Sequence, residues 1–329
     1  MKVLVTGASG AVGPALVDFL LQKSFAVRIL TRTPPPVNLF PETVECFQGD
    51  ICNPDTAIRA LEGIGIVYHL AAKLPLTNPA GDLQTVYQRV NVDGTRNLVQ
   101  AARSMGIARF VFFSTISVYG PGCETEVVDE TSPLNPQSLY AISKCEAEKI
   151  VLRSQRRDQN EPLGTVLRLA AVYGPRMRGN YASLVKALQS GRFIPIGAGQ
   201  NRQTLIYDQD AARAAVLAAS HSRAAGQVFN VTDGGIHALR DILAAICGAC
   251  GRRSPNYYLP AKPVWLAAGV AEFALKLIGN KSPIQRTHVE KLIEDRAVSG
   301  EKIQKQLGFQ PRYDLQQGWK ETIQHSRNA

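Results

Sequence analysis

Long apolar runs, dense cysteine patterns and basic clusters interleaved with aromatic residues are all scarce in this sequence of 329 residues. The longest apolar stretch near its end, PVWLAAGVAEFALKLIG (263–279), is interrupted by Glu272 and Lys276, so it is shorter than a bilayer span requires. No charged leader followed by an apolar block comes before VLVTGASG. We therefore expect a soluble protein that is not exported and that works in the cytoplasm.

The six cysteines and the net charge of +10 narrow the classes of ligand. Only Cys247 and Cys250 form a CxxC pair, which supplies two soft ligands where a closed zinc site needs four. We therefore predict reduced thiols and no metal. The densest basic segment, RSQRR (153–157), lies on an expected helix and lacks the aromatic residues of a nucleic-acid surface. A small molecule is the expected partner, and nucleic acid is not.

Short β-rich runs alternate with helical segments along the first half of the chain. Strand-like runs such as KVLVTG, AVRILTR, IVYHLAA and RFVFFST are apolar at nearly every position and are separated by helical patterns. This alternation is typical of βαβ units, and continuous apolarity is typical of parallel strands that helices cover on both faces. The sequence predicts an α/β fold with a doubly wound parallel sheet.

The pattern changes in the second half, where Pro, Gly and irregular helices dominate two segments. We predict a dinucleotide-binding domain over residues 1–175, completed by about 205–235. Residues 176–204 and 236–329 are predicted to form a smaller, mostly C-terminal substrate-binding domain. In the second of these segments, Leu266, Val270, Phe273 and Leu277 recur at helical spacing, as in core packing, an apolar pocket or a membrane-surface contact.

A glycine-rich turn, TGASGAVG, follows the first strand and opens the first helix. Its three glycines suit a tight turn, a close approach to a pyrophosphate and tight helix packing, with the phosphates at the helix N-terminus. Because the turn stands in the strand and helix context that a dinucleotide fingerprint needs, we predict a cofactor site. Its predicted contacts are Gly7, Ser9, Gly10, Ala11, Val12 and Gly13.

The second strand ends at Thr31 and Arg32, where NAD-binding proteins usually carry an acidic residue. An arginine pairs with a 2′-phosphate, which a carboxylate would repel, so we favour NADP(H) over NAD(H), with Arg28 nearby. The alternative is that Arg32 simply faces solvent. Asp50 follows the third strand and suits the adenine amino group, or else a loop beside the helix start at Asn53.

Tyr140 and Lys144 lie four residues apart in SLYAISK, on one face of an expected helix. Tyrosine needs a pKa about three units below its reference value of about 10 to act as a base near neutrality. A close ammonium supplies roughly that stabilisation, so we expect Lys144 to lower the pKa of Tyr140. Ser114 and Thr115 end the strand RFVFFST, where doubly wound sheets bind ligands.

The order of these motifs resembles the extended short-chain dehydrogenases/reductases, which include nucleotide-sugar epimerases, dehydratases and 3-beta-hydroxysteroid dehydrogenase-like enzymes. The resemblance spans nearly the whole chain and rests on TGASGAVG, GDICN, HLAA, NVDGTRNL, FFSTISVYG, YAISK, LRLAAVYGPR and FNVTDG.

The resemblance implies particular roles at matching positions. Tyr140 would be the acid/base, Lys144 its electrostatic partner and a ribose ligand, Thr115 the catalytic hydroxyl and Asn91 an active-site asparagine. The remaining cofactor contacts that it implies are Asp50 and Ile51 at the adenine and Ala71 and Ala72 in the cofactor groove. It also implies a homodimer through the pair of helices that includes the one carrying Tyr140.

The branch of the family is decided by a few residues. Ala171 stands where sugar-nucleotide members carry an asparagine, and the C-terminal tail resembles the hydroxysteroid dehydrogenase-like branch. Arg202 and Arg176, however, suit a diphosphate, unless they are only solvated loop charges; with Ser114 they complete the predicted substrate contacts.

We therefore predict an NAD(P)-dependent oxidoreductase acting on a secondary alcohol or ketone, with a sterol or long-chain keto compound as one candidate class. The alternatives are a nucleotide-sugar 4-epimerase or dehydratase and a non-catalytic dinucleotide sensor.

Overall fold

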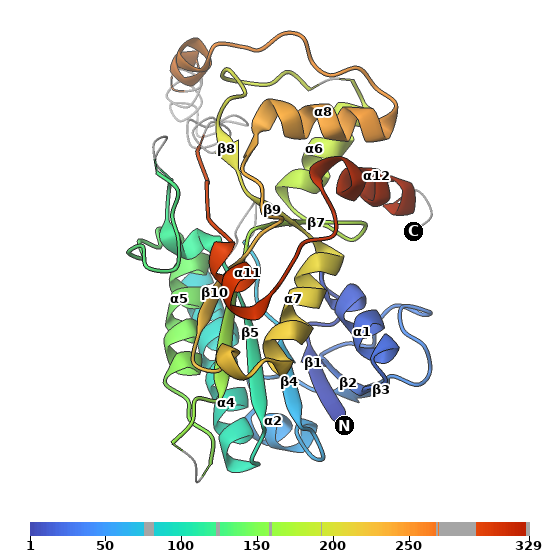
Figure 1. The fold of residues 1–329 in the computed structure, drawn as a ribbon, viewed down its shortest axis with the longest axis vertical. Coiled ribbons are helices and arrows are strands. Elements are labelled where there is room, and N and C mark those ends of the chain that lie inside the picture. Colours follow the sequence, from blue (N-terminus) through green and yellow to red (C-terminus); the bar gives the residue numbers. More distant parts are fainter. Residues whose placement is uncertain are drawn as a thin grey trace.

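A seven-stranded parallel sheet forms the larger lobe of the protein (Figure 1). The computed structural model describes residues 1–75, 82–122, 126–157, 160–191, 193–267, 269 and 294–326. The strand order is β10-β6-β5-β4-β1-β2-β3, and every neighbouring pair is parallel. The strands are β1 (Lys2–Thr6), β2 (Ala26–Thr31), β3 (Glu45–Gln48), β4 (Ile66–His69), β5 (Arg109–Thr115), β6 (Gly164–Leu169) and β10 (Val228–Val231). The predicted doubly wound α/β fold is confirmed.

Helices cover both faces of this sheet, which explains why its central strands are apolar along their length. All residues of β4 and β6 are buried. One face packs against α1 (Gly13–Gln22) and α7 (Asp208–Ser220), and the other against α2 (Pro54–Ala60), α4 (Gly94–Ser104) and α5 (Leu139–Leu152) (Figure 1). The carboxyl ends of the strands are therefore left as the open edge at which ligands bind in such sheets.

A smaller lobe lies beyond the carboxyl ends of the strands and has a hydrophobic cluster of its own. Its elements are β7 (Ala171–Tyr173), α6 (Asn180–Gln189), β8 (Arg202–Gln203), β9 (Leu205–Tyr207), β11 (His237–Ala238), α8 (Leu239–Cys250) and α12 (Leu315–Ser326). Helices α6, α8 and α12 lie together at this end of the molecule (Figure 1). The domain boundaries drawn from the sequence stay a prediction.

An aromatic cluster fills the base of the smaller lobe. Its members are Tyr173, Tyr181, Tyr207, Tyr313 and Trp319. Tyr173 stacks on Trp319 with ring centroids 4.6 Å apart, and Tyr207 contacts Tyr313 at 4.3 Å. The rings join strands β7 and β9 to helix α12, so the end of the chain is part of this core.

The segment 294–298 returns from the smaller lobe to the larger one. Val128 and Val298 form a parallel bridge, and a Cβ on Gly122 would lie only 2.1 Å from the carbonyl oxygen of Asp295. Helix α11 (Glu301–Leu307) then packs beside β10. Segments far apart in the sequence thus meet next to the end of β5.

Four sequence expectations concern composition or the C-terminal region. The five cysteines in the described part of the chain are free thiols. Among the described residues, no helix is long and apolar enough to cross a membrane, and no cluster of metal-ligating side chains is present. Of the predicted apolar helix face, Val270, Phe273 and Leu277 lie outside the described residues, and Leu266 is exposed.

Candidate functional site

The glycine turn has the geometry of an anion cradle. Gly7 adopts a left-handed φ of +71°, and a Cβ there would lie 2.6 Å from the backbone nitrogen of Ala71. A Cβ on Gly13 would lie 1.9 Å from the carbonyl oxygen of Ala8, so only glycine allows helix α1 to start this close to the turn. At Gly10 the one neighbour of a Cβ within 4 Å, among the described residues, would be the Gly7 carbonyl oxygen at 3.1 Å.

The N-terminus of α1 lies directly behind this cradle. No described side chain caps it, and Pro14 in its first turn has no N–H, so the N–H groups of Gly13 and Ala15 are without a side-chain cap. Ser9, Gly10 and Ala11 are partly exposed there, whereas Val12 is buried. Free N–H groups at a helix start attract phosphate, and the missing side chain at Gly10 gives a phosphate room to approach. The residues present therefore fit the pyrophosphate of a dinucleotide.

Arg32 and Asp50 lie together at the carboxyl ends of β2 and β3. Burial opposes ionisation of Asp50, but the hydrogen bond from the Cys52 N–H (3.0 Å) and the charges of Arg32 and Arg89 hold its pKa below the ordinary value. Arg32 is exposed. Its guanidinium is thus available to a ligand. It lies at the strand end where we expect the adenine ribose, beside the ionised carboxylate of Asp50.

Arg28 has a different role from the one that its closeness to Arg32 in the sequence suggests. Its guanidinium is buried, donates to Glu45 (2.8 Å) and also donates to the backbone carbonyls of Ala60 and Glu62, each at 2.9 Å. These bonds tie β2 to β3 and to the end of α2. Arg28 therefore cannot assist Arg32 at a 2′-phosphate.

Tyr140 stands in the first turn of α5, which Ser138 caps by accepting the Ala141 N–H at 3.1 Å. Its ring is partly exposed and meets the Tyr87 ring edge to face, with centroids 6.3 Å apart. Burial, and then the neighbouring Tyr87, raise the pKa of the Tyr140 phenol above its ordinary value. The expected lowering of the Tyr140 pKa is thus wrong for the protein alone, because loss of solvation raises this pKa.

Lys144 is buried one turn further along α5. Its Nζ lies 3.9 Å from the centroid of the Phe112 ring on β5. Burial lowers the pKa of Lys144 to about 7, although the charge of Glu148 acts in the opposite direction. An ammonium over a ring face retains hydrogen-bond donors for a ligand, so Lys144 fits the ribose hydroxyls of a nicotinamide nucleotide.

Thr115 and Ser114 end β5, and their side chains point to opposite faces of the sheet. Thr115 is partly exposed and accepts the Ser117 N–H at 3.2 Å, which caps the short 3-10 turn Ile116–Tyr119. Ser114 is buried and donates to Glu148 on α5. The predicted contact between Ser114 and a substrate does not fit this position; consecutive strand residues point to opposite faces.

A buried ionic network that the sequence analysis missed lies behind Lys144. Glu148 accepts from Arg168 of β6, with the shortest N–O distance 2.7 Å. Arg168 also donates to the hydroxyl of Tyr119 at 2.9 Å, which in turn donates to the side chain of Asn230 at 2.8 Å. The signals were the arginine inside an otherwise apolar strand and Glu148, which lies on the same helix face as Tyr140 and Lys144.

Asn91 is buried in a π-helical turn, Gln88–Asp93, and its side chain is fully engaged. It accepts the Lys73 N–H at 2.7 Å and donates to the Lys73 carbonyl at 3.2 Å and to Ser143 at 2.9 Å. Asn91 therefore fixes the loop that follows Ala71 and Ala72 against helix α5. Those two alanines are partly exposed along the groove, and Ile51 is buried against Gly94.

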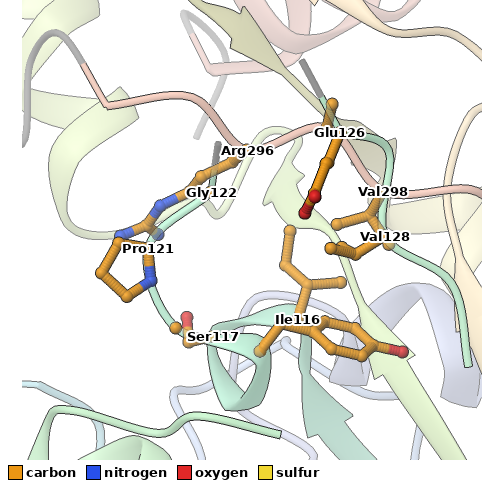
Figure 2. Close-up of a pocket in the computed structure, with 11 residues that line it drawn as sticks. Ile116, Ser117, Pro121, Gly122, Glu126, Val128, Arg296 and Val298 are labelled. Atoms are coloured by element: carbon orange, nitrogen blue, oxygen red, sulfur yellow. The ribbon is translucent and has the colours of Figure 1, made fainter. Parts of the chain in front are cut away.

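A small pocket opens just after the end of β5, between the loop that follows this strand and the returning segment 294–298 (Figure 2). Aliphatic side chains form much of its wall, namely Ile116, Val128, Ala297 and Val298. Its polar side chains include Ser117, Glu126 and Arg296, and the Glu126 carboxylate points into the space (Figure 2).

Arg202 lies next to this pocket but is already engaged. Its guanidinium forms an ion pair with Asp295 at 2.6 Å and donates to the Glu126 carbonyl at 3.2 Å. Arg176 is half-buried just after β7, and Ala171, at the start of β7, offers no polar side chain. Arg202 is therefore the less available of the two predicted diphosphate contacts, because it would have to leave Asp295 to bind a ligand.

Comparisons with known proteins agree with this geometry. The sequence model of the NAD dependent epimerase/dehydratase family matches residues 3–232. A 3 beta-hydroxysteroid dehydrogenase/Delta 5-->4-isomerase of Mycobacterium tuberculosis is 30% identical over 98% of this chain and 89% of its own. A UDP-glucose 4-epimerase of Vibrio cholerae is 31% identical, covering 98% and 94%. The structure of MoeE5 in complex with UDP-glucose and NAD is 26% identical and superposes with a TM-score of 0.76 over 100% of this chain and 99% of that one.

Proposed function

Because this chain belongs to the NAD dependent epimerase/dehydratase family, we propose that it is an NAD(P)-dependent oxidoreductase for a secondary alcohol or ketone with an apolar body. The observation that carries this choice of substrate is the engagement of Arg202, which is already paired with Asp295 next to the small, partly aliphatic pocket that follows β5. A diphosphate needs available cationic donors, whereas an apolar ligand gains by removing such walls from water. The 30% identity to a hydroxysteroid dehydrogenase supports the same choice.

In this proposal Tyr140 exchanges a proton with the substrate oxygen, and Thr115 holds that oxygen with a hydrogen bond. The raised pKa of Tyr140 keeps the phenol protonated, so in the protein alone it is ready to donate to a carbonyl. When bound, the cofactor would donate the hydride to a ketone or accept it from an alcohol, and its oxidised form would carry a positive charge. Lys144 holds the ribose hydroxyls beside Tyr140, and Asn91 acts indirectly by fixing the loop at Lys73.

The cofactor site is formed by Gly7, Gly10 and Gly13 with the N-terminus of α1, and NADP(H) is the favoured cofactor. Support for NADP(H) comes from the exposed guanidinium of Arg32. Asp50 lies close enough for Arg32 to influence its pKa, so a 2′-phosphate would share this arginine with a carboxylate. We therefore expect a preference for NADPH of about tenfold, which corresponds to roughly one charge-assisted hydrogen bond.

A nucleotide-sugar 4-epimerase is the second candidate, and the 31% identity to the Vibrio cholerae enzyme favours it. Against it stand Ala171, which offers no amide to a diphosphate, and the engagement of Arg202. The predicted homodimer belongs to the same set of proposals, and light scattering of the purified protein measures it.

Cofactor exchange and turnover together test the proposal. The stripped protein is titrated with NADPH and NADH by nicotinamide fluorescence, beside the variant Arg32→Ala. The protein is then assayed with cyclic and long-chain secondary alcohols and, separately, with UDP-glucose. Exchangeable cofactor and net oxidation of an apolar alcohol support the proposal. Tightly retained NAD with epimerisation of UDP-glucose would replace it by the second candidate.

A further inference from the structure

A buried histidine, His69, connects the glycine turn, which is the proposed cofactor turn, to the interior of the larger lobe. His69 ends β4 and has no exposed surface. Its Nδ1 lies 2.7 Å from the hydroxyl oxygen of Thr6, at the end of β1, and its Nε2 lies 2.9 Å from the hydroxyl oxygen of Thr95, on α4. Neither threonine was assigned a role above, and both are buried.

The direction of each hydrogen bond follows from the outer partners. The Thr95 hydroxyl donates its single hydrogen to the carbonyl of Asn91 at 2.6 Å, so it can only accept from His69. His69 Nε2 therefore carries a hydrogen. The Thr6 oxygen accepts the Ala71 N–H at 3.2 Å and has its own hydrogen left to donate to Nδ1. The ring is thus neutral, with the hydrogen on Nε2.

A protonated ring would not fit this arrangement. Both ring nitrogens would then donate, and the hydrogen of Thr6 would lose its acceptor. The surroundings act in the same direction: burial first, and then the charge of Lys144, lower the pKa of His69 to about 3. The other close neighbours are the rings of Phe110 and Phe112, with centroids 5.8 and 5.6 Å away, which carry no charge.

The bonds continue from Asn91 to the helix of Tyr140. The Asn91 amide donates to Ser143 at 2.9 Å, and the Ser143 hydroxyl donates to the carbonyl of Tyr140 at 2.8 Å. The full hydrogen-bond chain therefore contains Thr6, His69, Thr95, Asn91 and Ser143. One end lies at the backbone of the cofactor groove, at Ala71 and, through Asn91, at Lys73. The other end lies in the first turn of α5.

We propose that His69, as the neutral Nε2–H tautomer, is a positioning residue that holds the cofactor turn, the loop at Ala71–Lys73 and the Tyr140 helix in one fixed arrangement. The proposal rests on the proposed function only for the role of Tyr140. Its consequence for cofactor binding depends on the glycine turn alone. A single imidazole suits this place, because a neutral ring has one donor and one acceptor on opposite sides.

The tautomer is tested by nitrogen-15 NMR of the whole protein with labelled histidine. The chain has five histidines, and the signals of His69 are those absent from the variant His69→Gln. We expect a protonated Nε2, an unprotonated Nδ1 and no change between pH 5 and pH 8. A hydrogen on Nδ1, or a titration with a midpoint near 6.5, would overturn the proposal.

The positioning role is tested with two variants that each retain half of the chain. His69→Asn places an amide near the position of Nδ1 and loses the donor to Thr95, whereas His69→Gln reaches toward Thr95 and loses the acceptor for Thr6. We expect either variant to bind NADPH or NADH about tenfold more weakly, well below its unfolding temperature, since a small displacement at a binding site has a large effect. The exposed His325→Gln is the matched control and should bind as the native protein does.

If both His69 variants fail to fold, Thr6→Val removes one hydroxyl of the chain at nearly the same volume and should weaken binding in the same direction. Native cofactor affinity in folded His69 variants, or in a folded Thr6→Val protein where both His69 variants fail to fold, would refute the positioning role, even where melting temperatures fall. Because these readouts need no substrate, a failure of the proposed reaction leaves the test of His69 intact.

Discussion

The hydrogen-bond chain of the larger lobe and the aromatic cluster of the smaller lobe are both buried and polar, but they differ in completeness. In the chain, each side-chain donor has an acceptor with a defined direction. Around the aromatic cluster, four buried polar atoms have no hydrogen-bond partner among the described residues. They are the hydroxyls of Tyr173 and Tyr207, Oδ1 of Asp208 and Nε1 of Trp319.

This difference separates two kinds of interior. A complete network specifies one arrangement, because changing any member leaves its neighbour unpaired in a medium of low dielectric constant. An unpaired buried group contributes no such specificity and costs about 1–3 kcal/mol. The residues of the hydrogen-bond chain are therefore fixed by directional bonds, whereas the aromatic cluster depends on ring packing, which tolerates adjustment. Outside the hydrogen-bond chain, the larger lobe also has one buried hydroxyl, that of Tyr68, without a partner among the described residues.

The largest expected effect is a loss of activity on removal of the Tyr140 hydroxyl, which lies outside the hydrogen-bond chain. Tyr140→Phe removes the proposed acid/base and leaves the hydrogen bond to the Tyr140 carbonyl in place. We expect kcat to fall by about 10²–10⁴-fold, the usual contribution of a general acid, with cofactor affinity and thermal stability unchanged. Steady-state kinetics on an identified substrate, with fluorescence titration, measure both. Full activity would remove Tyr140 from the reaction.

The next effect tests the buried ionic network. Arg168→Met leaves Glu148 buried without its cation, and we expect the free energy of unfolding to fall by about 3–5 kcal/mol. Arg156→Met removes an arginine from the exposed pair with Glu161 and should cost at most about 1 kcal/mol. Urea denaturation of both variants gives the comparison. Equal losses would mean that burial of the first pair is unimportant.

A pair of single-hydroxyl deletions compares the two interiors directly. Thr95→Val leaves the Nε2–H of the buried His69 without an acceptor and should destabilise the protein by about 1–3 kcal/mol. Tyr207→Phe removes a hydroxyl that has no partner in the described structure and keeps the ring contact with Tyr313, so its stability should be unchanged or slightly higher. Denaturation midpoints show which variant loses more stability. A larger loss in Tyr207→Phe than in Thr95→Val would contradict the distinction between the two interiors.

The last expected effect is a pH dependence at Asp208, beside Tyr207 of the aromatic cluster. Burial raises the pKa of Asp208 to about 7, so the folded protein binds a proton that the unfolded chain has released above its ordinary pKa of 3.8. The stabilisation from this proton is complete below pH 3.8 and is lost as the pH rises to 7. Asp208→Asn should remove this decline. Unfolding temperatures of the native protein and of Asp208→Asn between pH 4.5 and 7.5 measure this pH dependence. An equal decline in the two proteins would refute the assignment to Asp208.

Much of the larger lobe could be predicted from the sequence, because its signals are local. Apolar strand runs, the glycine turn and the cap at Ser138 each follow from neighbouring residues. The burial of Ser114 and the separate role of Arg28 could not, since both depend on partners, Glu148 and Glu45, that only the fold brings near. The pKa of Tyr140 was misjudged for the same reason: pair spacing gives the charge of Lys144 but not the loss of water.

His69 shows a further limit. In IVYHLAA it looks like the end of an apolar strand, and nothing in its neighbours indicates that Thr6 and Thr95 enclose it. The pairing of Arg202 with Asp295 is hidden in the same way, because these residues are joined only when the chain returns from the smaller lobe. Local sequence patterns therefore do not predict interactions between segments that are distant in the sequence.

The return of residues 294–298 to Val128 also sets an order of assembly during protein synthesis. Chains emerge from the ribosome at about 5–20 residues per second and tend to fold N-terminal parts first. The glycine turn, His69 and Tyr140 are therefore available while the wall formed by Ala297 and Val298 is still untranslated. A nascent chain should therefore become able to hold a dinucleotide before the pocket that follows β5 is complete, so a bound cofactor would be the first ligand to stabilise the folded chain.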